Sequence, residues 1–206
     1  MVIICNKTPF HHIIVKETFG DVPYQEVWDE LVFLKLRMQG PEQTGASTSN
    51  TDPKDVRKKG VGVFLNKIYT DLSVSSIVFQ TKRFLTDKRL TDKIQGLAEE
   101  NYYFKHWNPE VLMDSFLAQY YDHGDFYKSH HDTALFSSVT VLHQTPKQYL
   151  GGNFVFPEFD YVVELEDNMS IIFPSVITHA IDELEIQKSG KMLGRFSITN
   201  FLNLRV

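Results

Sequence analysis

The stretch YYDHGDFYKSHHDTA, residues 120–134, holds three histidines, three aspartates and three tyrosines, a density of metal-ligating side chains that surface loops rarely reach. LMDSFLAQYY, which leads into it, is typical of a β-strand that ends in a turn at residues 122–125. If FYKSHHDTA continues as a strand, His130 and Asp132 point to one side and His131 to the other. An imidazole and a carboxylate facing one point are two parts of the two-histidine, one-carboxylate set that leaves three positions open on Fe(II).

The third ligand should come from a later strand that returns to the same end of the core. MSIIFPSVITHAID, residues 169–182, is an apolar strand and a Pro-Ser turn followed by His179, 47 residues after Asp132. A lone histidine in such a place is more often a packed or capping residue, and an H-x-D tripeptide alone is weak evidence of a metal. We single out His179 because it completes a set with His130 and Asp132, and we keep His131 as the rival ligand.

A basic residue on the final strand suggests an anion beside this metal. GRFSITNF, residues 194–201, alternates as a strand, so Arg195 and Ser197 share a face and Thr199 follows on it. A guanidinium that points into an apolar barrel is costly unless it meets an anion, and with a hydroxyl two residues on it could clamp a carboxylate. The alternative for Arg195 is a surface strand arginine.

The rest of the chain must supply the elements that position these residues. Residues 11–19 alternate enough for a first strand, and helices are expected over 23–38 and 86–104. The expected buried faces of the two helices are Val27, Leu31, Leu34 and Leu36, and Leu90, Ile94 and Leu97. From residue 112 onward, short β-branched and aromatic runs separated by turn residues predict a sandwich or barrel. We therefore expect an α+β chain, with helices first and a double-sheet core after them.

The order of these motifs resembles the iron(II)- and 2-oxoglutarate-dependent dioxygenases, most closely their prolyl 4-hydroxylase branch. That branch places its first two ligands in the pattern Y-x-x-G-x-x-Y-x-x-H-x-D, and here Tyr121, Gly124, Tyr127, His130 and Asp132 occupy every fixed place. YLGGNFVFPE and IIFPSVITHAID are similar to the branch's paired glycine before a strand and its F-P turn before the distal histidine. RFSITNF is similar to the last strand of the oxygen-sensing prolyl hydroxylases.

The resemblance covers about residues 113–202. It implies a double-stranded β-helix (jelly-roll) catalytic core over these residues, with the N-terminal helices packed on one sheet, in a single domain of residues 1–206. It also implies oxidative decarboxylation of 2-oxoglutarate to succinate, coupled to hydroxylation by O₂, with ascorbate as an optional reductant.

The resemblance assigns roles to individual residues. His130, Asp132 and His179 match the Fe(II) ligands, and Arg195 matches the basic residue that pairs with the far carboxylate of 2-oxoglutarate. Tyr121 resembles the tyrosine that also reaches this carboxylate, and Tyr127 resembles one that lies near the substrate. Ser197 and Thr199 are weaker cosubstrate-binding candidates, and Lys191 is expected to stay in its turn. Because ligating histidines must be neutral, we expect metal affinity to weaken as the pH falls towards about 6.5.

Composition limits the other possibilities. The net charge of -5 and pI near 5.9 argue against a nucleic-acid partner. A single cysteine excludes an intrachain disulfide, and no apolar run suggests a membrane span or signal peptide, so we expect a cytoplasmic protein. Residues 39–60 are polar and rich in Gly, Pro, Ser and Thr, which indicates either a flexible insertion or a lid over bound substrate.

The sequence leaves the substrate open. The branch implies a procollagen-proline 4-dioxygenase-like hydroxylase acting on proline in a peptide or protein, and the alternative is an oxygenase acting on a free amino acid or other small molecule. A nucleic-acid dealkylase would carry extra arginines in its last strand, whereas here none follows Arg195 until Arg205. A non-catalytic jelly-roll binding module would not need the intact ligand set, and a zinc hydrolase would leave Arg195 unexplained. His11 and His12 are expected at a strand edge, and His143 is a minor candidate for the barrel mouth.

Overall fold

Seven antiparallel strands form the larger sheet of the protein. A computed structural model describes residues 1–44, 55–108 and 113–203, apart from the side chains of Met113 and Asp114. The strand order is β1-β2-β10-β6-β13-β4-β3. The strands span Val2–Asn6 (β1), His12–Lys16 (β2), Val61–Phe64 (β3), Met113–Tyr121 (β4), Phe136–His143 (β6), Met169–Pro174 (β10) and Arg195–Asn203 (β13).

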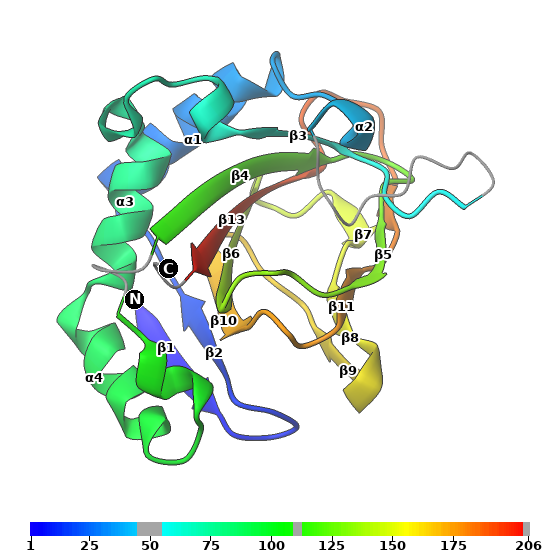
Figure 1. The fold of residues 1–206 in the computed structure, drawn as a ribbon. Coiled ribbons are helices and arrows are strands. Elements are labelled where there is room, and N and C mark those ends of the chain that lie inside the picture. The colour runs from blue at the N-terminus through cyan, green and yellow to red at the C-terminus, as the bar shows by residue number, and fades with distance from the viewer. Residues whose placement is uncertain (45–54, 109–112, 204–206) are drawn as a thin grey trace.

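A four-stranded sheet faces the larger one (Figure 1) and has the order β5-β11-β8-β9. It comprises Tyr127–His130 (β5), Phe154–Phe156 (β8), Tyr161–Val163 (β9) and His179–Ile181 (β11), while Tyr149–Gly151 (β7) and Leu184–Ile186 (β12) form a separate pair. An aromatic-rich core that includes Phe154, Phe156 and Phe173 fills the space between the sheets. Two sheets closed over a shared core give the jelly roll that the motifs imply, so the predicted fold class is confirmed.

The helices cover the outer face of the larger sheet (Figure 1). They span Asp21–Lys35 (α1), Pro41–Thr44 (α2), Ser76–Leu85 (α3) and Lys88–Ala98 (α4), with 3-10 turns at Leu65–Lys67 (η1), Leu72–Val74 (η2), Tyr103–His106 (η3) and Pro157–Phe159 (η4). Ser75 caps α3 by accepting a hydrogen bond from the Val78 amide at 3.2 Å, and Asp87 caps α4 by accepting one from the Arg89 amide at 2.9 Å. None of the helices in the described part of the chain is long and apolar enough to cross a membrane.

Strand β13 separates the two cores because its side chains alternate. Phe196, Ile198 and Leu202 point into the core beneath the helices. Ser197 and Thr199 lie on the opposite face, where they line a cavity between the sheets. The strand therefore presents apolar groups to the helices and polar groups to the cavity, as its sequence predicts.

Three expectations about the elements need correction. Strand β1 precedes all the helices, strand β3 lies between α2 and α3 in the sequence, and both strands join the larger sheet. The chain therefore does not place its helices before its strands. Leu36 follows the end of α1 and is 86% exposed, whereas Val27, Leu31 and Leu34 are buried as predicted. Strand β2 lies between β1 and β10, so His12 is not on an edge strand, and its side chain is fully buried.

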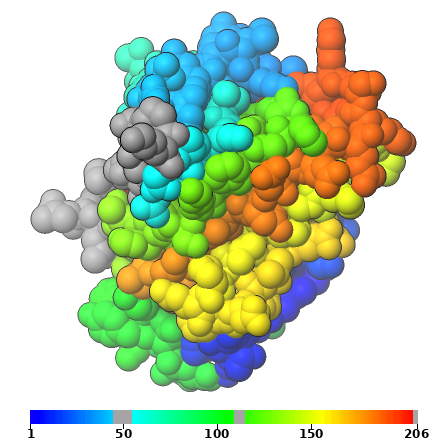
Figure 2. Space-filling model, turned by 90° about the vertical axis from the view of Figure 1, so that its right-hand side faces the viewer, coloured from blue at the N-terminus to red at the C-terminus, as the bar shows by residue number. Residues whose placement is uncertain are grey.

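The expected lid, residues 39–60, is described only at its two ends, and residues 45–54 lie outside the described part of the chain. On one side, Gln39 and Gly62 exchange two backbone hydrogen bonds of 2.9 and 2.8 Å. On the other side, the amide of Lys59 donates to the Phe126 carbonyl at 2.9 Å, and the amide of Lys128 donates to the Arg57 carbonyl at 2.8 Å. Figure 2 shows the cyan residues after position 54 lying against the green residues that lead into β5. Both described ends are thus anchored on strands.

Candidate metal centre

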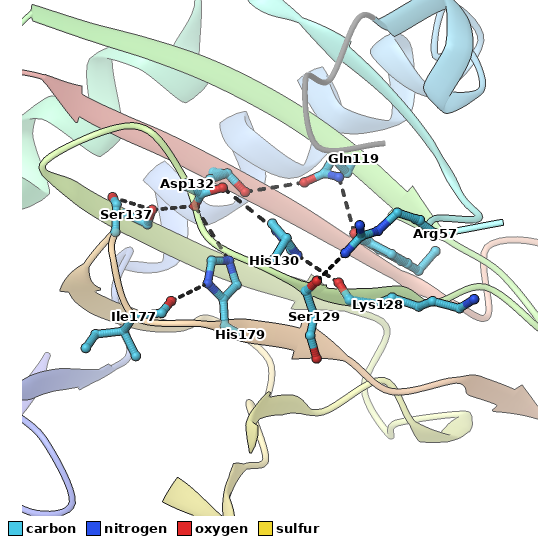
Figure 3. Close-up of polar contacts among 12 residues, drawn as sticks. Arg57, Gln119, Lys128, Ser129, His130, Asp132, Ser137, Ile177 and His179 are labelled. Carbon is cyan, nitrogen blue, oxygen red and sulfur yellow. Dashed lines mark hydrogen bonds and ion pairs between the residues drawn. The ribbon is translucent and has the colours of Figure 1, made fainter. Parts of the chain in front are cut away.

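Three candidate ligands from separate parts of the sequence converge on one point. Strand β5 ends at His130 and β11 begins at His179, and these two residues are direct partners across the antiparallel pair. Asp132 follows β5 and lies next to both imidazoles, with its carboxylate oxygens 3.8 Å from Nε2 of His130 and 3.6 Å from Nε2 of His179 (Figure 3). One ligand atom from each of the three residues lies within 4.8 Å of the others.

Backbone carbonyls orient both imidazoles. Nδ1 of His130 lies 2.9 Å from the carbonyl oxygen of Lys128, and Nδ1 of His179 lies 2.9 Å from that of Ile177 (Figure 3). Because a carbonyl oxygen only accepts hydrogen bonds, each Nδ1 carries a proton and each Nε2 keeps its lone pair for a ligand. Hydrogen bonds of this kind fix the tautomer and ring orientation of metal-binding histidines.

Two serines hold the carboxylate of Asp132. The hydroxyl of Ser137 donates to Oδ2 of Asp132 at 2.6 Å, and the hydroxyls of Ser137 and Ser175 lie 2.8 Å apart. The amide of Asp132 also donates to the carbonyl oxygen of Ser175 at 3.0 Å. Asp132 therefore has a fixed position although it lies beyond the end of a strand.

Aromatic rings enclose the histidines and change their protonation. The Tyr127 ring stacks on His130 with centroids 3.6 Å apart, and the Phe154 ring lies nearly parallel to His179 at 5.4 Å. Burial, with a further contribution from the neighbouring His179, lowers the pKa of His130 to about 3. Burial also lowers the pKa of His179, although Asp132 opposes this shift. Both shifts favour the neutral imidazoles, so protons compete with a metal at more acidic pH than the sequence led us to expect.

A cavity of about 190 Å³ opens beside these three side chains. Its walls include four residues that the sequence selected: Tyr121 from β4, Tyr127 from β5, and Ser197 and Thr199 from β13. Gln119, which the sequence analysis missed, lies between them. Its amide nitrogen donates to the Tyr121 hydroxyl at 3.2 Å, and its amide oxygen accepts from the Thr199 hydroxyl at 3.3 Å. The two-residue spacing of Gln119 and Tyr121 along one strand was the signal that could have identified it.

Arg195 is buried next to Tyr121, one of the residues that line the cavity. The residue is 1% exposed, and Nε, Nη1 and Nη2 are buried with no hydrogen-bond partner among the described residues. Arg195 pairs across the strands with Tyr121, and its guanidinium carbon lies 5.1 Å from the centre of the Tyr121 ring. Burial lowers its pKa. Arg195 does not itself line the cavity, but Tyr121 and Ser197, its neighbours on the same face, do.

These observations test whether the residues fit the groups that the motifs imply. Two neutral imidazoles and a carboxylate suit a divalent transition metal with open positions. A buried guanidinium with three unused nitrogens suits a carboxylate, because bidentate pairing would satisfy those donors. The residues present thus fit both Fe(II) and a carboxylate-bearing ligand.

Lys58 is a second buried cation at the cavity, and the sequence analysis assigned it no role. Its side chain is 7% exposed and lines the cavity, with Nζ 4.5 Å from the centre of the Tyr127 ring. Burial lowers the pKa of Lys58 to about 8, although the charge of Asp132 opposes the shift. Nothing in the local sequence marks this lysine, because its burial depends on the pairing with β5.

The other candidates do not belong to the group of candidate ligands. His131 is exposed and does not line the cavity, and Lys191 is exposed. His143 is buried next to Arg195 in the adjacent strand, but it does not line the cavity. The structure therefore separates the rival histidines from the set His130, Asp132 and His179.

Comparison with known proteins places the fold. No family model and no curated protein matches the sequence. Among solved structures, a prolyl 4-hydroxylase from Pseudomonas putida aligns with a TM-score of 0.54 and 12% identity, over 95% of this chain and 93% of that one. A prolyl hydroxylase from Trichoplax adhaerens, solved with a peptide of the hypoxia-inducible factor oxygen degradation domain, aligns with a TM-score of 0.60 and 12% identity, over 93% and 83%.

A third solved structure is similar over a comparable length. The non-heme α-ketoglutarate-dependent epimerase SnoN from nogalamycin biosynthesis aligns with a TM-score of 0.52 and 9% identity, over 93% of this chain and 77% of that one. The chain therefore has the fold of prolyl hydroxylases and related 2-oxoglutarate oxygenases, as the motif resemblance implies.

Proposed function

We propose that this protein is an Fe(II)- and 2-oxoglutarate-dependent dioxygenase that hydroxylates proline in a peptide or protein. The observation that carries the proposal is the convergence of His130, Asp132 and His179 on a cavity lined by Tyr121. Next to Tyr121 lies the buried Arg195, whose guanidinium has no hydrogen-bond partner among the described residues. A zinc hydrolase or a binding module would use the three ligands but would leave the guanidinium without a purpose. The fold shared with prolyl hydroxylases supports the oxygenase class.

Each side chain has a definite task in this proposal. Nε2 of both histidines and a carboxylate oxygen of Asp132 would hold the iron, and its remaining positions would be available to ligands in the cavity. Arg195, with the hydroxyl of Tyr121, receives the far carboxylate of 2-oxoglutarate, and Ser197 and Thr199 line its site. When bound, iron and 2-oxoglutarate supply the oxidising chemistry, in which O₂ is consumed, succinate and CO₂ form, and a C–H bond of the substrate is hydroxylated.

The protein contributes position and exclusion of water. Tyr127 and Phe154 enclose the imidazoles, and a dry site strengthens each electrostatic contact within it. Tyr127 also faces the cavity, which suits contact with substrate. In the proposal, residues 113–202 form the catalytic core of a single domain, and residues 39–60 act as a lid whose far end is anchored beside Tyr127.

Anaerobic titration tests the proposal. Adding Fe(II) and 2-oxoglutarate should produce the weak visible charge-transfer band of a chelated keto acid, and a His130→Ala variant should lose it. His131→Ala is the matched control, because His131 is exposed and does not line the cavity. No band in the wild-type protein at saturation would exclude the oxygenase class. Succinate production with and without ascorbate and proline-containing peptides then ranks the substrates.

A further inference from the structure

Lys58 places a second positive charge at the cavity, beyond the one that the proposed cosubstrate uses. Its side chain is 93% buried, since only 7% is exposed, although an aliphatic chain of this length usually carries its ammonium out to water. The next residue, Lys59, does reach solvent. The inward direction of Lys58 follows from the bridge that its backbone makes with Tyr127.

The ammonium of Lys58 lacks an anionic partner among the described residues. It lies over the face of the Tyr127 ring, 4.5 Å from the ring centre. Asp132 acts on it only at longer range, because the Asp132 oxygens face Ser137 and the two imidazoles. A buried cation without a counter-ion costs free energy, and such groups are normally paired.

The formal charges at the site with iron and 2-oxoglutarate bound show how much negative charge is missing. The ferrous ion and Arg195 together carry three positive charges, and Asp132 and a doubly ionised 2-oxoglutarate together carry three negative charges, so these four groups balance. The positive charge of Lys58 then remains unbalanced. One further negative charge, supplied from outside the protein, would balance it.

We propose that Lys58 binds a carboxylate of the substrate, so that the enzyme selects acids over the corresponding amides. This inference rests on the proposed function and narrows its substrate class. The carboxylate belongs either to a free amino acid or to an acidic residue beside the hydroxylated position of a peptide. Lys58 lines the same cavity as the metal ligands, so it would hold this carboxylate close to the reacting carbon.

Equilibrium binding without turnover tests the inference. The protein is loaded with Mn(II) and N-oxalylglycine, an inert analogue of 2-oxoglutarate, and titrated by calorimetry with two pairs of probes. One pair is L-proline and L-prolinamide, and the other is a blocked tetrapeptide with Asp after proline and its Asn counterpart. The pair that shows acid preference identifies the source of the carboxylate.

The variants separate charge from shape. Lys58→Met should raise the Kd of the preferred acid at least about tenfold, the size of a lost charge-assisted hydrogen bond, and leave the amide Kd unchanged. Lys58→Arg should keep the preference. Lys59→Met, which removes the same charge from an exposed neighbouring position, should bind as wild type does.

Two results would overturn the inference. The first is a wild-type protein that binds neither acid probe better than its amide. The second is a Lys58→Met variant that weakens the anaerobic 2-oxoglutarate titration as much as it weakens acid binding, while Arg195→Met leaves that titration unchanged. Lys58 would then be the cosubstrate anchor. In both cases the charge-transfer band of the wild-type protein shows separately whether the proposed function holds.

Discussion

Replacing Arg195 by methionine should stabilise the ligand-free protein and reduce the stabilisation that 2-oxoglutarate gives. The guanidinium is 1% exposed, and its three nitrogens have no partner in the described part of the chain, so folding buries a cation without compensation. An apolar side chain of similar length avoids this desolvation. Replacing a buried ion pair by apolar residues stabilises proteins by up to about 1–4 kcal/mol. We expect a gain in the same range at Arg195, whose guanidinium has no hydrogen-bond partner among the described residues. In a domain of this size each kcal/mol raises the melting midpoint by roughly 2–4 °C.

The ligand should stabilise the wild-type protein more than the variant. At a concentration of about 100 times its Kd, 2-oxoglutarate stabilises the wild-type protein by about 2.7 kcal/mol. If loss of the guanidinium weakens binding tenfold, the same concentration stabilises the variant by only about 1.4 kcal/mol, and a hundredfold loss leaves about 0.4 kcal/mol. Arg195→Met should thus be the more stable protein without ligand and should gain clearly less when the ligand is added.

Urea unfolding with saturating Mn(II), with and without 2-oxoglutarate, measures both effects. Arg37→Met removes the same charge from an exposed helix end, and it should change the free energy of unfolding by less than about 0.5 kcal/mol. A ligand-free Arg195→Met protein that is less stable than wild type would refute the view of Arg195 as an unpaired cation. Equal gains from 2-oxoglutarate in the two proteins would refute its role as the carboxylate anchor.

Three other perturbations test the surroundings of the site. Ser137→Ala should weaken Mn(II) binding about tenfold in a chelator competition, because it removes the hydrogen bond that holds the Asp132 carboxylate. Ser138→Ala is the control and should leave Mn(II) binding unchanged, because the buried Ser138 hydroxyl has no partner among the described residues. The free energy of unfolding of the metal-free protein should fall as the pH drops from about 6.5 towards 3, by up to about 1.4 kcal/mol per pH unit. In this pH range His130 binds a proton in the unfolded chain, but in the folded protein its lowered pKa of about 3 keeps it neutral. Urea melts of His130→Gln should show a shallower slope, and an unchanged slope would mean that other groups cause it. Gly194→Ala should destabilise the protein by about 1–3 kcal/mol or more, because the added Cβ would collide with the Tyr121 carbonyl oxygen. Gly96→Ala, which adds a Cβ in open space on α4, should stabilise the protein by up to about 1 kcal/mol. Equal thermal midpoints for the two variants would contradict this reasoning.

The sequence predicts the ligand set because local rules determine most of it. Strand alternation selects His130 and Asp132 over His131, and the apolar strand before His179 returns that residue to the same end of the core. Strand alternation does not show which residue lies opposite His130 in the neighbouring strand. His179 lies directly opposite His130 in neighbouring strands, a register that depends on how the whole four-stranded sheet assembles. The motif order supplied that information where periodicity did not.

Residues whose environment depends on distant pairing escaped prediction. Lys58 lies in a segment whose polar composition predicts a loop. It becomes buried only because that segment pairs with β5. The short strand β1 shows no clear alternation and is held by β2 alone, so its apolar start did not mark it as a strand. No element was predicted over residues 72–85, where α3 lies, because its helical signal is mixed with β-branched residues. Leu36 fits the helical spacing, but α1 ends one residue earlier.

The pairing of residues 57–59 with β5 also limits how widely the entrance can open. Strand β5 is the outermost strand of its sheet, and this segment supplies its missing neighbour through the Lys59–Phe126 and Lys128–Arg57 backbone hydrogen bonds. If the segment detached to admit a bulky substrate, β5 would expose unpaired backbone amides and carbonyls. Another extended chain could pair with this edge, and such pairing leads to intermolecular sheets. While this pairing persists, β5 does not expose these groups, so we expect a substrate to enter beside the paired segment without displacing it.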